Sequence, residues 1–171
     1  MTERLSTLTL IHANQSASDV FCDFGRYSNG MTQKPIVFET THTVQFSDLD
    51  SYGHVGTGRY GAFYVDHRMQ GLRERIGWNA RKLAELPYAV WVRRLEIDFI
   101  RPLMPDQAFT ITSFVREFRG PDAVIELTMT DGSGKRLSCA VMTAACVDKA
   151  TGRGKDWPAD AVAEFYEAEG A

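Results

Sequence analysis

The stretch that decides the fold is Asp48-Leu49-Asp50-Ser51-Tyr52-Gly53-His54-Val55-Gly56-Thr57-Gly58-Arg59-Tyr60. It places two carboxylates, an imidazole and several glycines between a segment with strand pattern and a segment with helical pattern. Backbone N–H groups in the first turn of a helix have no partner inside the helix, so an acid or base beside them can act together with them. No other stretch of the sequence concentrates reactive side chains in this way.

The flanking segments have clear periodicities. Apolar and polar residues alternate over residues 41–47, which predicts a short, half-buried strand that ends at the first aspartate. Over residues 58–76 the apolar residues recur mostly at three- and four-residue steps, which predicts one long amphipathic helix. Gly77 suits the left-handed residue that ends a helix, and Gly56 or Thr57 is expected at the N-cap.

The second half of the chain predicts strands. Alternating patterns centre on residues 95–99, 109–116 and 125–129, and a nearly continuous apolar run covers residues 137–147. Segments rich in proline and glycine separate them, so we expect hairpin turns and an antiparallel meander. The apolar run should be a central strand or lie at an interface, and residues 159–167 predict a short C-terminal helix.

The ends and the composition bound the domain organisation. Residues 1–38 show no useful period and are read as an N-terminal extension, whereas residues 39–171 form the patterned domain; a translation start at Met31 stays open. The 171 residues suit one domain with its own core, and a net charge of −3 gives no basic field for nucleic acid or anionic membranes.

The expected location follows from what the composition excludes. Three cysteines without a CxxC pair argue against a disulfide scaffold and a thiolate zinc site. The first apolar run is too short for a signal peptide or for the roughly 20 residues that span a bilayer. We therefore expect a cytoplasmic protein that does not enter membranes.

The order of elements predicts an α+β fold. One strand, one long helix and then four strands suit a curved five-stranded antiparallel sheet wrapped around a long central helix, with a short C-terminal helix. The helix covers one face of this sheet, and the other face still needs burial. A second copy of the chain would bury it, so we expect a homodimer, with a dimer of dimers as the alternative.

The motifs resemble a known family. The run Phe46-Ser47-Asp48-Leu49-Asp50-Ser51-Tyr52-Gly53-His54-Val55, with Tyr60 behind it, resembles the signature of hotdog-fold acyl-CoA thioesterases of the 4-hydroxybenzoyl-CoA thioesterase type. Further similarity lies in Leu95-Glu96-Ile97-Asp98-Phe99-Ile100-Arg101-Pro102-Leu103 with Asp106, and in Val147-Asp148-Lys149-Ala150-Thr151-Gly152-Arg153 with Trp157-Pro158. The resemblance covers about residues 39–168 and implies the hotdog fold.

The resemblance also implies the site and its chemistry. Asp50 is the expected catalytic carboxylate, as nucleophile or general base, while the backbone N–H of Thr57 polarises the thioester carbonyl. His54 is expected to have an orienting role and not an essential one. No cofactor and no metal is expected. The implied substrate-binding residues are Gly53, Val55, Gly56, Gly58, Tyr60, Tyr64 and Arg101. Many relatives carry other residues where this chain has Gly56-Thr57, so the substrate contacts there should differ.

Each of these residues has an alternative interpretation. Asp48 is expected to be a turn or capping carboxylate, and a metal site on Asp48, Asp50 and His54 is disfavoured because three ligands on one tight turn converge poorly. Asp66 and His67 are expected to pair with neighbours such as Gln70 on the same helix. Candidates to bind the phosphates of coenzyme A are Arg93, Arg94, Arg101, Arg116, Arg119 and Arg136, and aromatic candidates for an acyl pocket include Phe63 and Trp91.

The sequence therefore favours hydrolysis of an acyl-CoA thioester to a free acid and CoA. Two alternatives remain open at this stage: a non-catalytic acyl-thioester binding module, and a thioesterase that acts on acyl-carrier-protein substrates. A hotdog dehydratase is disfavoured because that activity needs a paired histidine and acid near a longer overhanging helix, which the sequence does not predict.

Overall fold

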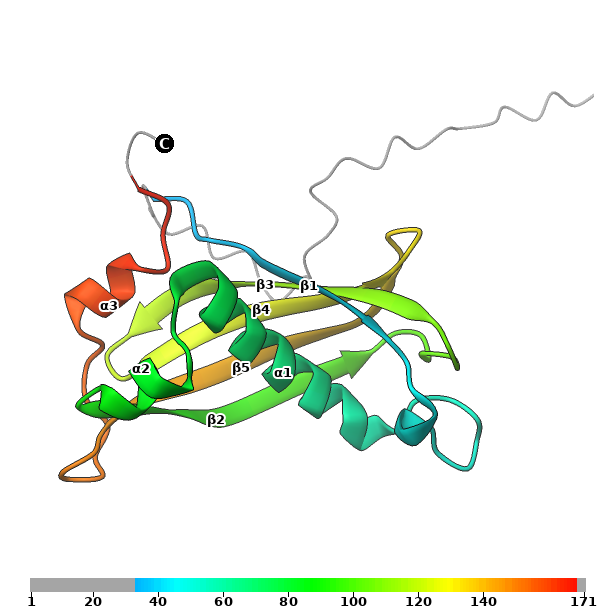
Figure 1. Ribbon diagram of the computed structural model, residues 1–171, viewed down its shortest axis with the longest axis horizontal. Helices are drawn as coiled ribbons and strands as arrows, with labels where there is room; N and C mark the ends of the chain where they lie inside the picture. The colour runs from blue at the N-terminus through cyan, green and yellow to red at the C-terminus, as the bar shows by residue number, and fades with distance from the viewer. Residues whose placement is uncertain (1–32, 169–171) are drawn as a thin grey trace, which may run out of the picture.

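The computed structural model describes residues 33–168, in which a five-stranded antiparallel sheet curves around one long helix (Figure 1). The strands are β1 (Phe38–Thr43), β2 (Tyr88–Phe99), β3 (Ala108–Arg119), β4 (Asp122–Asp131) and β5 (Arg136–Asp148). The helices are α1 (Thr57–Ile76), α2 (Ala80–Glu85) and α3 (Ala159–Ala163), with a 3-10 helix over Phe46–Asp48. This arrangement agrees with the expected α+β architecture.

The strand order is β1-β3-β4-β5-β2, which differs in part from the expected meander. β3, β4 and β5 follow one another through tight turns, as predicted. β2 instead pairs with β5, from Tyr88 opposite Asp148 to Phe99 opposite Ser138. The segment after β2 is therefore a crossover to β3 and not a hairpin, because apolar alternation reports which faces are buried and does not identify the neighbouring strand.

The first strand lies earlier than residues 41–47. β1 pairs with β3 from Phe38 opposite Ser113 to Thr43 opposite Ala108, and the chain then turns into the 3-10 helix. Phe46 is 90% exposed and therefore does not point inward with Val44, which is buried. Phe38 belongs to the core although the sequence analysis assigns it to the extension; residues 1–32 of that extension lie outside the described residues.

The long helix begins and ends almost where the sequence predicts. Gly56 is the N-cap of α1, and Gly77 at its C-terminus has φ 72°, the left-handed conformation that glycine adopts without strain. Gly71 lies directly on the Phe38 ring, where a Cβ atom would overlap the ring carbons. The absence of a side chain at this position lets the helix approach β1 closely.

Two short helices lie beyond the C-terminal end of α1. α2 is absent from the sequence prediction, although Asn79 caps it by accepting a hydrogen bond from the Lys82 N–H at 3.0 Å. α3 ends at Ala163 and is shorter than the predicted 159–167. Phe165 still packs edge-on against Trp78, with ring centroids 5.6 Å apart, so the segment after α3 closes this end of the core.

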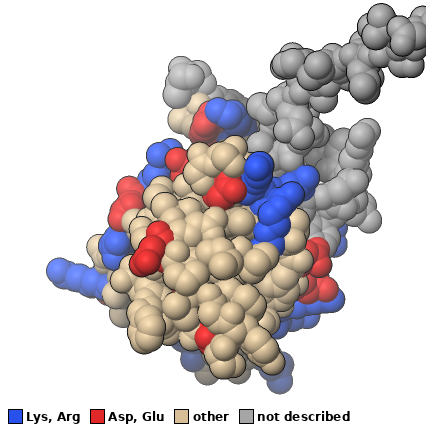
Figure 2. Space-filling model, turned by 90° about the vertical axis from the view of Figure 1, so that its right-hand side faces the viewer, with Lys and Arg blue, Asp and Glu red and all other residues tan. Residues whose placement is uncertain are grey.

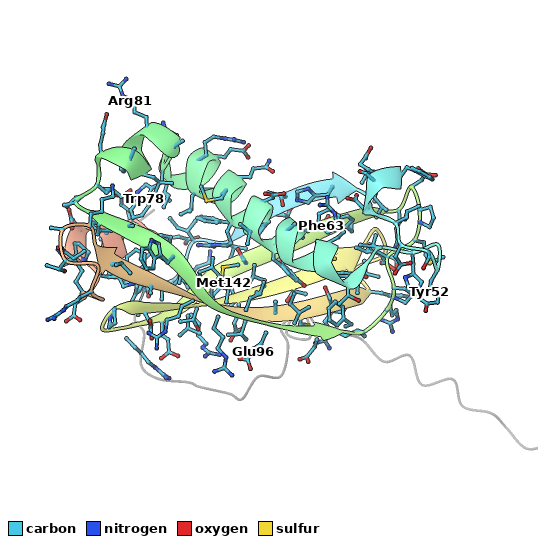
Figure 3. The ribbon with its side chains drawn as sticks, turned by 90° about the horizontal axis from the view of Figure 1, so that it is seen from below. Tyr52, Phe63, Trp78, Arg81, Glu96 and Met142 are labelled. Carbon is cyan, nitrogen blue, oxygen red and sulfur yellow. The ribbon has the colours of Figure 1, made fainter. Side chains whose placement is uncertain are left out.

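The core fills the space between α1 and the concave face of the sheet. β5 is buried along most of its length on both faces, as predicted for the apolar run, and β4 shares this property. In Figure 3, Met142 of β5 lies on the helix side of the sheet and Glu96 of β2 on the opposite side. Within residues 33–168 no helix has the length and apolar character needed to cross a membrane.

The cysteines of β5 differ from one another. Cys146 is a free, buried thiol. Cys139 is disulfide-bonded, which the cysteine count did not predict.

Candidate active site at the start of α1

The loop before α1 folds back on itself and presents Asp50. Leu49 and Val55 form an isolated antiparallel bridge, and the Asp50 N–H donates to the His54 carbonyl at 2.9 Å. The Gly53 N–H donates to the Asp50 carbonyl at 3.1 Å, and Gly53 has φ 78°, a value that requires glycine or costs strain. The local sequence thus builds a tight turn whose two ends are fixed by backbone hydrogen bonds.

Asp48 anchors this loop to the helix. Its side chain is buried, and Oδ1 accepts from Arg59 Nη2 at 2.6 Å and from Nε at 2.9 Å. Oδ2 accepts from the Gln45 N–H at 2.8 Å, while the Asp48 carbonyl accepts from the Gly56 N–H at 3.0 Å. With its oxygens bound in this way, Asp48 has the structural role that the sequence predicts.

Asp50 differs from Asp48 in its exposure and its surroundings. Its side chain is 31% exposed, and Oδ1 accepts from the Tyr52 N–H at 2.8 Å. Oδ2 lies 3.6 Å from His54 Nδ1, which is too long for a hydrogen bond. A Cβ atom on Gly56 would lie 3.5 Å from the Asp50 Cβ, so this carboxylate stands next to the N-terminus of α1.

The first turn of α1 offers free donors beside that carboxylate. Within residues 33–168, the backbone N–H groups of Thr57 and Gly58 have no hydrogen-bond partner, whereas the Arg59 N–H donates to the Gly56 carbonyl at 2.8 Å. A Cβ atom on Gly58 would meet nothing within 4 Å, so space is open in front of the backbone. Such N–H groups at the positive end of a helix can bind a developing oxyanion.

A cavity of about 240 Å³ lies at this helix start. Five predicted site residues line it together: His54, Val55, Thr57, Tyr60 and Arg101. The rest of the wall consists of Phe99, Ile100 and Pro102, which follow from the end of β2. Asp50, Gly53, Gly56 and Gly58 belong to the adjoining loop and helix start and are not part of the cavity wall.

Leu103 ties the three parts of the site together, and sequence reasoning missed its role. Its carbonyl accepts from the Val55 N–H at 3.0 Å, and its N–H donates to the Tyr60 hydroxyl at 3.0 Å. Burial raises the pKa of Tyr60, so the phenol stays protonated. Because both bonds are made by the Leu103 backbone, the identity of the residue does not reveal its role. The available sequence signal for it is the pair of nearby prolines, which mark a turn.

Two helix residues that the sequence singles out point into the core. Tyr64 is fully buried with its hydroxyl 2.6 Å from Ser138 Oγ, burial raises its pKa far above the usual range, and it is not part of the cavity wall. His67 does not pair with Gln70, because it is completely buried and bonds to Thr40 and Ser113 instead. Helical spacing shows which side chains point inward, but not what they meet there.

Most of the candidate phosphate-binding arginines already have acidic partners. The ion pairs are Arg93 with Asp122, Arg94 with Glu96, Arg116 with Glu126, and Arg119 with Glu117. Arg101 differs because it lines the cavity and donates through Nη1 to the Arg136 carbonyl at 2.6 Å. Figure 2 shows that the end of the molecule that carries the loop is otherwise largely uncharged, and its exposed side chains include Phe46 and Tyr52.

Sequence comparison yields two matches. A family model described as the thioesterase-like superfamily matches residues 44–165. The long-chain acyl-CoA thioesterase FadM of Escherichia coli K12 is 25% identical over 114 residues, which cover 66% of this chain and 85% of FadM. The residues matched by the family model include the Asp50 loop and α1.

Solved structures with the same arrangement confirm the hotdog fold. The probable thioesterase YbaW from Escherichia coli has a TM-score of 0.68 at 22% identity, with 76% of this chain and 99% of that chain covered. A probable thioesterase from Bartonella henselae has a TM-score of 0.65 at 26% identity, with 72% of this chain and 100% of that chain covered. A hypothetical protein from Staphylococcus aureus, solved in complex with CoA, has a TM-score of 0.70 at 19% identity, with 80% of this chain and 85% of that chain covered.

Proposed function

The chain belongs to the thioesterase-like superfamily, and we therefore propose that it hydrolyses an acyl-CoA thioester to the free acid and CoA. One observation carries the proposal: a partly exposed carboxylate, Asp50, stands beside an unpaired N–H, that of Thr57, at the mouth of a cavity. The match to a long-chain acyl-CoA thioesterase and the CoA-bound structural neighbour support CoA as the carrier of the acyl group.

The chemistry follows from these two groups. The carbonyl oxygen of the thioester accepts the Thr57 N–H, which stabilises the negative charge that develops on this oxygen. Asp50 then attacks the carbonyl carbon to form a mixed anhydride, or removes a proton from the water that attacks. In both routes the carbon–sulfur bond breaks, the electron pair leaves with the CoA sulfur, and water supplies the oxygen of the acid.

The surrounding residues take supporting roles in this proposal. His54, with Nδ1 3.6 Å from Asp50 Oδ2, orients the carboxylate. Val55 and Tyr60 line the acyl side of the cavity, while Gly53, Gly56 and Gly58 leave room for the thioester along the backbone. Arg101 is the arginine of the cavity wall and binds a CoA phosphate.

We further propose that the active unit is a homodimer joined along β2. This strand has twelve residues and forms one edge of the sheet, so no described strand pairs with its outer side. Trp91, Val92 and Phe99 on it are about half exposed. A long edge strand with exposed apolar residues is protected from aggregation when a second copy pairs with it. A dimer of dimers and a cytoplasmic location stay predictions from the sequence.

Substitution of Asp50 tests the catalytic role. Asp50→Asn removes both the nucleophile and the base, so hydrolysis of acyl-CoAs of graded chain length should fall at least ~100-fold, as for loss of a positioned acid–base group. Asp66→Asn is the matched control, because Asp66 is an exposed carboxylate farther along α1. An unchanged kcat/KM in Asp50→Asn would exclude this role.

Substitution of Thr57 tests the backbone donor in the same assay. Thr57 is the first residue of α1, where proline is tolerated, and Gly56 before it has ψ 140°, which a following proline accepts. Thr57→Pro therefore removes the N–H without breaking the helix, and kcat should fall by about 10²–10³. Thr57→Ala keeps the N–H and should stay within a few fold. Equal losses in both variants would assign the effect to the side chain.

The substrate panel also separates the alternative functions. Carrier-protein thioesters in the same assay identify an enzyme that prefers them to CoA esters. Binding of acyl-CoA without turnover of any thioester would instead favour a non-catalytic binding module. The 4-hydroxybenzoyl-CoA type of activity requires that the aromatic ester be the best substrate of the panel.

A further inference from the structure

A second cavity, of about 530 Å³, lies at the other end of α1. It is lined by α1, α2, β2 and the inner face of the sheet, and it shares no wall residue with the Asp50 cavity. Its walls are mainly apolar and include Trp78, Val115, Ile125, Met142 and Phe165. Figure 3 shows Met142 and Trp78 on the helix side of the sheet. The volume falls within the range of about 300–1,000 Å³ typical of small-molecule sites.

One cation in this apolar wall lacks a counter-charge. Arg68 lines the cavity and is only 6% exposed. Nη1 donates to Ser113 Oγ at 2.9 Å, and no carboxylate of residues 33–168 lies within ion-pair distance of the guanidinium. Burial lowers the pKa of Arg68 to about 9, so it remains positively charged at neutral pH. A buried unpaired charge costs several kcal/mol.

The neighbours of Arg68 do not neutralise it. Ser113 accepts from Arg68 and lies 2.8 Å from Nε2 of His67, whose pKa burial lowers to about 3, so His67 is neutral. The Phe38 ring lies 4.4 Å from the guanidinium carbon and covers one of its faces, which leaves donors at its edge. A ring face offsets part of the cost of burying a cation but carries no net charge.

The other cation of the wall is already engaged. Lys149 Nζ donates to the carbonyls of Ala84 and Leu86 at 2.7 Å each and to that of Leu83 at 3.2 Å. It therefore fixes the end of α2 and does not face the cavity as a free charge. The cavity combines one available positive charge with a large apolar wall.

We propose that this cavity binds an aliphatic carboxylic acid, whose carboxylate pairs with Arg68 and whose hydrocarbon chain lies against the apolar wall. A guanidinium and a carboxylate match in charge and in planar, two-pronged geometry. Phosphate monoesters carry more charge than one arginine balances, and the apolar wall would leave the excess unsolvated. A neutral hydrocarbon would fill the space but leave Arg68 unpaired.

The tryptophans provide a direct probe of this site. The chain contains three of them, Trp78, Trp91 and Trp157, and all three line the cavity. Dodecanoate with bromine on its terminal carbon should therefore quench the intrinsic fluorescence of the full-length protein in a saturable way. The titration is made without CoA and below the concentration at which the acid forms micelles.

The role of the charge is tested with matched variants and ligands. Arg68→Met should weaken binding at least tenfold, whereas Arg75→Met, the same change on the exposed side of α1, should leave it unchanged. In the wild type, bromododecanol should bind at least tenfold more weakly than the acid, a comparison that needs no variant. Arg68→Lys keeps the charge without the planar fork and should give an intermediate affinity.

Several outcomes would overturn the proposal. These are no saturable quenching, equal affinity for the acid and the alcohol, or equal affinity in the wild type and a folded Arg68→Met. Asp50→Asn should bind the acid as the wild type does, because the two cavities share no wall residue. Weaker binding in Asp50→Asn would place the acid in the thioester site instead. Loss of hydrolysis in Asp50→Asn does not affect this test, because the test measures binding of the acid and not turnover.

Discussion

At the scale of single residues, a buried polar chain links α1 to β1 and β3. Arg68 has no acceptor, so Ser113 Oγ accepts from its Nη1 at 2.9 Å, and the same hydroxyl lies 2.8 Å from His67 Nε2. His67 Nδ1 lies 2.7 Å from Thr40 Oγ1, which in turn lies 2.7 Å from His42 Nε2. Four hydrogen bonds thus connect Arg68 on the helix to His42 on the sheet edge.

This network makes the stability of the protein depend on pH. Burial, with Arg68 and His42 nearby, lowers the pKa of His67 from 6.5 to about 3. Below pH 6.5 the unfolded chain takes up a proton at His67 that the folded chain does not, so the contribution is complete above pH 6.5 and is lost as the pH falls. His67 alone should therefore lower the free energy of unfolding by about 1.4 kcal/mol per pH unit between pH 6 and 4.

Urea unfolding at several pH values measures this slope. His67→Gln removes the titrating group, so its slope should be smaller than that of the wild type by about 1.4 kcal/mol per pH unit, whatever its absolute stability. Equal slopes in the wild type and His67→Gln would show that His67 is protonated in the folded state.

At the scale of elements, the contact between α1 and β1 depends on one glycine. A Cβ atom on Gly71 would overlap the Phe38 ring, so Gly71→Ala should destabilise the fold by about 1–3 kcal/mol. Gly61 in the same helix is the matched control, because its Cβ atom would lie 3.7 Å from Leu95 Cδ2, an ordinary contact. Gly61→Ala should stabilise by up to about 1 kcal/mol. Chemical denaturation of both variants measures the difference, and similar effects at the two sites would refute the close-packing argument.

The same elements show how much of the fold and of the site can be predicted from the sequence. The bounds of α1 and the position of Asp50 beside its start could be predicted, because glycine caps and periodicity are local signals. The pairing of β2 with β5 and the buried contacts of Tyr64 and His67 could not, since they depend on residues far away in the sequence. Leu103 contributes to the site through its backbone alone, which residue identity does not report.

At the scale of the whole molecule, the two edges of the sheet differ. β1 forms one edge with six residues, and β2 forms the other with twelve. The end of β2 leads into Phe99, Ile100 and Arg101, which line the Asp50 cavity. Pairing of β2 with its copy would therefore bring the second subunit close to the proposed active site, and the dimer would contribute to substrate binding as well as to stability.

Light scattering coupled to size-exclusion chromatography tests this dimer. The wild type should have about twice the mass of one 19.2 kDa chain. Val92→Lys places a charge near the middle of β2, where two copies would oppose each other across a two-fold axis, so this variant should be monomeric. Thr41→Lys makes the matched change at an exposed position of β1 and should remain dimeric. A monomeric wild type, or a dimeric Val92→Lys, would rule out pairing along β2. If Val92→Lys is monomeric and its KM for the acyl-CoA is raised, the partner subunit lies beside the substrate.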